Sequence, residues 1–263
     1  MSNIETQPRS PSQTSQYEDC GWRWWLQRGE RVEQRPAAWS HHGTAFHSAA
    51  EAFERSGRTM SAEEVLQVFS DQYSALTNKS LDKWPDTDQW MSAGRYTGGE
   101  DIERRYGLGQ QQTTEYVAWS LENEPKFWKS PTGDVGLELS FMVELGGVKV
   151  RGFIDQLLDE SANVVRVRDL KTGSTKSKLQ LHTYSLAVQQ VWKVEAPKAD
   201  WYLAKDGRLS RPVKLTEEAA EETAERYAAM DAAVKRGDAP ARPGFNCNFC
   251  DVSHACVFFS AKS

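Results

Sequence analysis

Two aspartates and a lysine on consecutive predicted strands are the residues of this chain best suited to metal-dependent hydrolysis. Asp155 falls on a strand predicted over 148–158, Asp169 lies on the next one, over 164–170, and Lys171 directly follows it. Alternate side chains share one face of a strand, so Asp169 and Lys171 point the same way. A three-residue loop at 161–163 would place Asp155 opposite Asp169, where two like charges destabilise a sheet. A divalent cation with oxygen ligands would offset that repulsion, with the lysine beside it.

An acid-x-Lys triplet is weak evidence when it stands alone. Chance is expected to produce about one such triplet in a chain of this length and composition. Glu124-Pro125-Lys126 is in fact a second one, at the end of a predicted helix. The argument therefore depends on the strand context of Asp169-Leu170-Lys171 and on the facing acid in Gly152-Phe153-Ile154-Asp155.

Three further residues are placed where they could join this site. His47 lies inside a helix predicted over 43–55, although a single helical histidine is more often a core or surface residue than a metal ligand. Gln180 and Tyr184 are four residues apart on a helix predicted over 179–192. Both can therefore face the end of the preceding strand.

In chain order these residues resemble the motif series of the RecB-like PD-(D/E)xK exonucleases, from about residue 15 to the end. The matching segments are Gly43-x-x-x-His47, Gly152-x-x-Asp155, Asp169-Leu170-Lys171-Thr172-Gly173 and Gln180-x-x-x-Tyr184. The resemblance implies an α/β fold, in which a mixed central sheet flanked by helices follows a helical region and precedes a metal-cluster segment. It also implies hydrolysis of DNA, on single strands or ends, in recombination, repair or phage DNA metabolism.

The same resemblance implies a role for each site residue. One or two Mg²⁺ or Mn²⁺ ions would be bound by His47, Asp155, Asp169 and the Leu170 carbonyl. Lys171 would position or activate the attacking water, as a fixed cation or as a base. Gln180 and Tyr184 would contact DNA or support the site. Glu138, on a strand predicted over 135–145, matches an acid often found in such proteins.

The four cysteines form a second candidate metal site. Cys247, Cys250 and Cys256 make a C-x2-C-x5-C pattern near the end of the chain. In a reducing cytoplasm, clustered thiols indicate metal binding or catalysis before disulfides. The fourth ligand is either Cys20, which leaves no orphan thiol, or His254, which lies closer to Cys256 than usual zinc spacings.

One cysteine near the N-terminus with three at the C-terminus resembles the iron–sulfur nucleases, namely the AddB-type subunits and the CRISPR-adaptation nucleases. That resemblance implies a [4Fe–4S] cluster, which suits cysteine-only ligation; Zn²⁺ is the alternative. The segment 17–26 around Cys20 also resembles the opening motif of that group, with Gly21 where those proteins often have proline. Trp24 in this segment could stack on bases, but such aromatic residues more often belong to the core.

The elements that position these sites fall in one predicted domain. Residues 1–14 are polar and predict a disordered tail, and 15–263 form a single nuclease domain. Within it, 15–125 are mainly helical, 135–215 form the catalytic sheet core, and 216–263 form a helix and a cysteine cluster that closes onto Cys20.

Local signals set the expected bounds of several elements. Ser15 and Ser61 each begin a capping-box pattern, opening helices to about residue 26 and about residue 76. Residues 88–123 are mostly helical with an interruption near 98–99, Gly146-Gly147 is a hairpin turn, and Thr216 caps a helix to about Lys235.

Charge is unevenly distributed along the chain. The net charge of −5 and the pI near 5.7 argue against a generic nucleic-acid binder, because phosphate contacts need local cations. However, residues 164–214 hold eleven Lys or Arg and four Asp or Glu, whereas 216–231 hold six acids and one Arg. The basic block is compatible with a nucleic-acid track, and a pair of solvated faces is the other interpretation.

Other sequence features define the setting and the competing functions. No apolar run approaches the roughly 18 residues of a membrane span, and the first fifteen residues lack the apolar core of a secretory signal. We therefore expect a cytoplasmic protein of a bacterium or a phage-infected host. No GxxxxGK[ST] phosphate loop occurs, so a helicase motor would be a separate recombination partner. The alternatives are a non-catalytic DNA-binding subunit and a zinc-stabilised interaction module; the intact set of site residues favours the nuclease.

Overall fold

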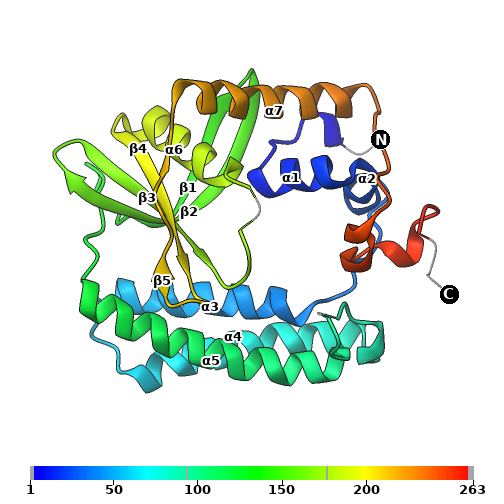
Figure 1. Ribbon diagram of the computed structural model, residues 1–263, viewed down its shortest axis with the longest axis horizontal. Coiled ribbons are helices and arrows are strands. Elements are labelled where there is room, and N and C mark those ends of the chain that lie inside the picture. Colours follow the sequence, from blue (N-terminus) through cyan, green and yellow to red (C-terminus); the bar gives the residue numbers. More distant parts are fainter. Residues whose placement is uncertain (1–2, 93, 176, 260–263) are drawn as a thin grey trace.

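A mixed sheet of six strands forms the centre of the computed structural model, which describes residues 3–92, 94–175 and 177–259 (Figure 1). The strand order is β1-β2-β3-β4-β5, with β6 paired to β4. The strands are β1 Leu137–Leu145, β2 Val148–Ser161, β3 Val164–Lys171, β4 Glu195–Leu203, β5 Arg208–Leu209 and β6 Val213–Lys214. β3 and β4 are parallel and the other pairs antiparallel. Parallel neighbours need a crossover connection, which helix α6 (Leu179–Trp192) provides.

Helices cover both faces of the sheet, which confirms the predicted α/β architecture (Figure 1). One layer consists of α3 (Ala38–Arg55), α4 (Ala62–Lys83) and α5 (Gly98–Asn123), with the 3-10 turn η2 (Thr87–Gln89) before α5. Its apolar core includes Phe46 and Tyr116, packed against Leu170 and Tyr202 of the sheet. On the other face, α6 and α7 (Glu217–Lys235) bury a cluster with the strands.

Local signals predicted several of these bounds well. α6 has the predicted limits, and Thr216 caps α7 by accepting a hydrogen bond from the Ala219 N–H. Ser61 makes the predicted capping box, but α4 extends beyond the predicted end to Lys83. α3 begins earlier than predicted, at Ala38. α5 begins only at Gly98, because the capping box that starts it belongs to Thr97 and not to the residues around 88.

The predicted disordered tail over 1–14 is wrong for the described residues 3–14. They form the 3-10 turn η1 (Asn3–Glu5) and the start of α1 (Pro11–Asp19), which Ser10 caps. Arg9 is 1% exposed, and its Nη2 lies 2.7 Å from Oδ1 of Asp231 on α7. Its backbone N–H donates to the Lys149 carbonyl at 2.8 Å. The polar composition predicted disorder because these partners lie far along the chain.

The helix predicted to run from Ser15 through residue 26 is two helices, α1 and α2 (Gly21–Arg28), separated by Cys20 in an extended conformation. A side chain on Gly21 would place its Cβ 2.7 Å from Cδ of Pro240, so only glycine allows the loop before the cysteine triad to pack there. Cys20 at this corner lines a cavity together with the three C-terminal cysteines. Trp24 is 1% exposed and belongs to the core, as predicted.

The pairing of β2 with β3 has the predicted register, although its loop differs. Gln156 pairs with Arg168 and Leu157 with Val167, the register in which Asp155 falls opposite Asp169. The connection is Ala162-Asn163, shorter than the predicted 161–163. A bulge at Glu160, between the Asp159–Val165 and Ser161–Val164 pairs, compensates for the missing loop residue.

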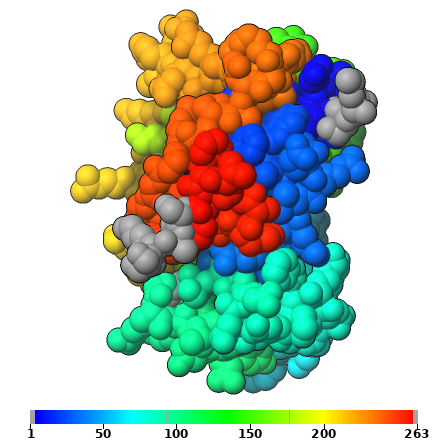
Figure 2. Space-filling view, turned by 90° about the vertical axis from the view of Figure 1, so that its right-hand side faces the viewer, coloured from blue at the N-terminus to red at the C-terminus, as the bar shows by residue number. Residues whose placement is uncertain are grey.

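The C-terminal segment packs against the N-terminal helices. Figure 2 shows residues near the C-terminus, in red, beside the blue N-terminal region. This segment contains the 3-10 turns η3 (Phe245–Phe249) and η4 (Ser253–Ala255). Asp251 between them accepts hydrogen bonds from Arg23 at 2.9 Å and from Gln27 at 2.7 Å on α2. None of the helices in the described part of the chain is long and apolar enough to span a membrane.

Candidate active site and cysteine cluster

The two predicted acids are buried on neighbouring strands, Asp155 in the middle of β2 and Asp169 near the end of β3. Oδ2 of Asp155 accepts a hydrogen bond from the backbone N–H of Leu170 at 2.7 Å, which ties its carboxylate to the neighbouring strand. Asp155 is 7% exposed and Asp169 is fully buried. Oδ2 of Asp169 lies 2.8 Å from Nζ of Lys171, whereas its Oδ1 has no hydrogen-bond partner among the described residues.

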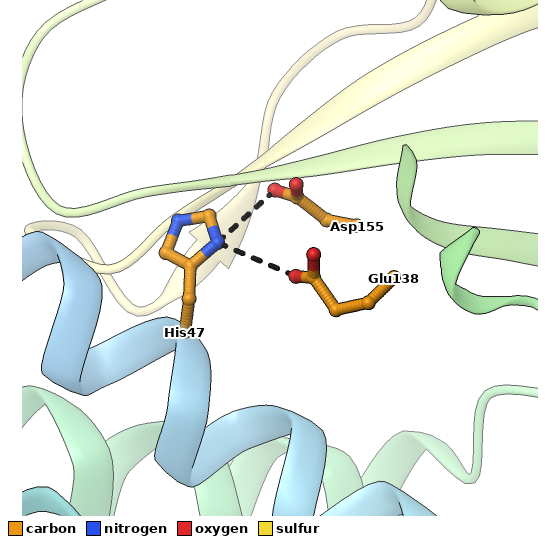
Figure 3. A group of neighbouring side chains, drawn as sticks. All are labelled: His47, Glu138 and Asp155. Atoms are coloured by element: carbon orange, nitrogen blue, oxygen red, sulfur yellow. Dashed lines mark ion pairs between the residues drawn. The ribbon is translucent and has the colours of Figure 1, made fainter. Parts of the chain in front are cut away.

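His47 reaches this pair of strands from α3. Its Nδ1 lies 3.5 Å from Oδ2 of Asp155 and 3.8 Å from Oε1 of Glu138. Its Nε2 lies 3.0 Å from the Leu170 carbonyl oxygen. Figure 3 shows His47, Glu138 and Asp155 pointing toward one another from α3, β1 and β2. One potential ligand atom from each lies within 4.8 Å of the other two, so the structure groups Glu138 with the predicted ligands His47 and Asp155; among the described residues Asp169 does not belong to this group.

The backbone of Glu138 is unusual for a residue within a strand. Its φ of 48° lies in the left-handed region, which side chains other than glycine rarely adopt. Its neighbours Leu137 and Leu139 nevertheless keep their pairing with Gln156 and Ile154. Residues held in such conformations occur often at functional sites. The distortion is local, and the Glu138 carboxylate is directed toward His47.

The charged groups of this cluster shift one another's pKa values. Burial lowers the pKa of His47, but the carboxylates of Asp155, Glu138 and Asp169 outweigh burial and raise it to about 9. Burial raises the pKa of Asp155 to about 7; His47 opposes this rise, while Asp169 and Glu138 add to it. Burial also raises the pKa of Asp169, against the opposing effect of Lys171. The metal-free site therefore keeps protons that a bound cation would displace.

Lys171 is held by the two residues predicted on the following helix. Its Nζ donates to Oε1 of Gln180 at 2.9 Å, and Nε2 of Gln180 donates to the Tyr184 hydroxyl at 2.7 Å. The Tyr184 ring packs edge-on against Phe141 with the ring centroids 5.7 Å apart. A Cβ on Gly152 would lie 2.8 Å from Cζ of Phe141, which gives a packing reason for glycine in Gly152-x-x-Asp155.

The donor set fits a hard divalent cation. Carboxylate and carbonyl oxygens are the ligands that Mg²⁺ prefers, and imidazole is also compatible with several divalent metals. A buried carboxylate oxygen without a partner is energetically costly, and Oδ1 of Asp169 has none among the residues that the structure describes. A cation bound between Asp155 and Asp169 would give that oxygen a partner and reduce the repulsion between the two acids.

The four cysteines, all free thiols, line one small cavity between the corner at Cys20 and the C-terminal segment. His254 does not line this cavity; its ring packs edge-on against Trp84 with the centroids 5.7 Å apart. Among the described residues, no three of the cysteine sulfurs lie within 4.8 Å of one another. Four sulfurs around one zinc ion at about 2.3 Å would lie only about 4 Å apart.

Two residues beside the site were not among the sequence-predicted candidates. Arg151 and Phe153 line a groove that also contains Asp155, and both side chains are exposed. The sequence does contain a signal for them, because Arg151 and Phe153 precede Asp155 at alternate positions of the strand and therefore share its face.

A mixed sheet that carries two buried acids and a lysine, with a histidine from an adjacent helix, is the arrangement of nucleases that use divalent metals. In agreement with this class, the sequence profile of the PD-(D/E)XK nuclease superfamily matches residues 8–257, and the chain belongs to this superfamily.

Relatives of known sequence and structure agree with this assignment. The "Gene 69 protein" of Mycobacterium phage L5 is 35% identical, over 95% of this chain and 96% of its own. The protein of the same name from Mycobacterium phage D29 is 36% identical, over 98% and 100%. A crystal structure from Eubacterium rectale, which bears a provisional exonuclease assignment, has a TM-score of 0.54 and 14% identity, covering 100% of this chain and 93% of its own. At that identity the likeness establishes a shared fold alone.

Proposed function

We propose that this protein is a Mg²⁺- or Mn²⁺-dependent DNA exonuclease that acts on single strands or on DNA ends. The observation that carries the proposal is the fully buried Asp169, whose Oδ1 lacks a hydrogen-bond partner among the described residues and whose Oδ2 lies 2.8 Å from Nζ of Lys171. An acid in that position is costly to the fold. A role in metal binding and hydrolysis explains the buried carboxylate of Asp169, which the fold alone does not require.

In this proposal the metal ligands are His47, Glu138, Asp155, Asp169 and the Leu170 carbonyl. When bound, a divalent ion supplies charge stabilisation at the scissile phosphate and a more acidic water. Lys171 would then position or activate the attacking water, as a fixed cation or as a base. Gln180 keeps the Lys171 ammonium in place, and Tyr184 keeps Gln180 in place.

The cysteines belong to the same proposal as ligands of a [4Fe–4S] cluster. Cys20 lines the cavity with the C-terminal triad, whereas His254 lies outside it. No three of the described cysteine sulfurs lie within 4.8 Å of one another, whereas the ligands of a single zinc ion lie about 4 Å apart. In an iron–sulfur cube each thiolate binds a different iron, so wider spacing is expected. The cluster would join the two ends of the nuclease as a structural clip.

Phage DNA metabolism is the proposed setting, because the similar proteins of phages L5 and D29 match over nearly their whole length. Within that setting recombination or repair of DNA ends is a natural use of an exonuclease. The chain contains no GxxxxGK[ST] phosphate loop, so a helicase would act as a separate partner.

A nuclease assay with end-labelled linear DNA tests the proposal. The parent protein with Mn²⁺ should release short products progressively from DNA ends, and EDTA should stop the reaction. Asp169→Ala should be inactive, whereas Asp159→Ala, which removes an exposed acid from the same sheet, should be active. Full activity of Asp169→Ala would contradict the proposed site. Binding of DNA without any cleavage would instead favour a non-catalytic subunit.

A further inference from the structure

The hairpin of β1 and β2 exposes two large apolar side chains that the fold does not need. Phe153 is 59% exposed and Met142 is 54% exposed. Ser140 pairs with Phe153 and Met142 with Arg151, so these four residues share one face of the hairpin. We name this face, formed by Ser140, Met142, Arg151 and Phe153, the hairpin shelf. Exposed apolar residues that lie together indicate a binding surface more often than scattered ones do.

The hairpin shelf is continuous with the candidate active site. All four of its residues line one groove, and Asp155 and Gln180 line the same groove. The opposite wall is formed by the start of α1, residues 10–13, and by Arg28 of α2. Arg9 holds that wall in place through its buried ion pair with Asp231. A chain-like ligand lying in the groove would therefore reach the carboxylates directly.

The charges of the groove favour a polyanion. Arg151 and Arg28 lie in it. Arg28 donates hydrogen bonds to the side-chain carbonyls of Gln16 at 2.8 Å and Gln27 at 3.0 Å, so Arg151 is the exposed cation of the groove. Cations that follow a groove together with exposed aromatic rings are the features of single-strand binding, since bases stack on the rings and phosphates bind the cations. Bases in a duplex are already stacked, so such a surface discriminates against double-stranded DNA.

We propose that the hairpin shelf binds unpaired nucleotides, with a base stacked on Phe153 and a phosphate bound by Arg151. The proposal rests on the nuclease function above and names its substrate as the single strand. Phe153 then positions the strand, while the carboxylates and Lys171 act on the phosphodiester.

Fluorescence anisotropy with a labelled oligothymidylate measures this contact without cleavage when every protein carries Asp169→Ala. Phe153→Ala in that background should raise the Kd for the single strand by about 5-fold to about 100-fold. It should change the Kd for a blunt duplex much less, and Phe153→Trp should restore single-strand binding. Leu121→Ala is the matched control, because Leu121 is 52% exposed on α5 outside the groove. An unchanged Kd in Phe153→Ala, or an equal loss on single strand and duplex, overturns the proposal.

Abasic oligonucleotides provide a second test that leaves the parent fold intact. Moving one abasic position along the strand should identify a site where the missing base weakens binding, and Phe153→Ala should add little further loss there. If the effects of the abasic position and of Phe153→Ala on the binding free energy are additive at every position, the stacking contact is overturned. If Phe153 governs single-strand binding but the parent protein with Mn²⁺ degrades no DNA, the hairpin shelf stands and the proposed nuclease activity fails.

Discussion

The Lys171 ammonium donates a hydrogen bond to the side-chain carbonyl of Gln180 at 2.9 Å, and this contact joins the end of β3 to the first turn of α6. Asp169 lies 2.8 Å from the same ammonium. Lys171 thus has one anionic and one neutral partner. The neutral partner can be removed without disturbing the buried acids.

Gln180→Ala should lower kcat by roughly tenfold to a hundredfold, the range expected for losing a hydrogen bond to a charged group. Lys171→Ala should lower it further, by about 10²- to 10⁴-fold. Because Gln180 acts through the lysine, the double variant should be no slower than Lys171→Ala alone. Steady-state kinetics on labelled single strands measure this, with Gln190→Ala on the same helix as control. Independent, additive losses would show that Gln180 does not act through Lys171.

His47→Ala should weaken Mn²⁺ binding more than it weakens folding. Nδ1 of His47 faces Glu138 and Asp155, and its side chain is partly exposed, so its loss creates no large cavity. Calorimetric titration with Mn²⁺ and a thermal melt of the same sample separate the two effects. Parent-like Mn²⁺ affinity with a large loss of thermal stability would identify His47 as a core residue.

The metal-free protein should lose stability as the pH rises from about pH 6 to about pH 9. The pKa of His47 is raised from 6.5 to about 9 in the folded protein, so its stabilising contribution is fully present below 6.5 and disappears toward 9. The pKa of Asp155, raised from 3.8 to about 7, gives a loss of the same sign that begins near pH 4 and extends to about pH 7, so it overlaps only the start of that range.

Thermal melts in EDTA across this pH range measure the effect. Asp155→Asn should give a shallower fall, because it removes one titrating group and also the main carboxylate that raises the pKa of His47. Added Mn²⁺ should stabilise the parent more at high pH, where protons compete less for its ligands. If the thermal stability of Asp155→Asn falls with pH as steeply as that of the parent, the pH dependence does not come from Asp155 and His47.

Arg9→Ala should destabilise the protein by about 1.5–3 kcal/mol, the range for losing a hydrogen bond to a charged group, because Asp231 loses its buried partner but keeps Lys235 at 2.7 Å. Arg9 also donates to the Ile4 carbonyl at 2.9 Å, so the loss should release the start of the chain. Arg236→Ala removes the exposed Arg236–Asp238 pair and should cost only about 0–1 kcal/mol. Urea unfolding of the two variants and of the parent measures these changes in the free energy of unfolding. Equal, small effects would support the disordered tail that composition predicted.

Cys20→Ser should give colourless, unstable protein although it leaves every proposed catalytic residue intact. If the cluster crosslinks both ends of the chain, its loss increases the conformational entropy of the unfolded chain. By analogy with disulfides, this lowers the free energy of unfolding by on the order of 4–5 kcal/mol. His254→Ala should retain the colour and about four iron atoms per chain. The visible spectrum and metal analysis of anaerobically purified protein measure this. The reverse pattern would replace the cluster with a zinc site of three cysteines and one histidine.

The sequence alone predicted those features that depend on near neighbours along the chain. Thr216 and the apolar periodicity define α7 and α6, and Gly146-Gly147, both with positive φ, form the predicted hairpin turn. Strand alternation placed Asp169 and Lys171 on one face. These signals are local because a cap, a turn or an alternating strand is stabilised mainly by residues a few positions away.

Tertiary structure decided the features whose partners lie far apart in sequence. Arg9 is ordered by Asp231, which is 222 positions away, and Cys20 meets the C-terminal triad only because the chain returns to it. The left-handed backbone of Glu138 and the bulge at Glu160 likewise occur where β2 pairs with its neighbouring strands. Such arrangements follow from burial and charge pairing in the assembled core, and residues a few positions away along the chain do not encode them.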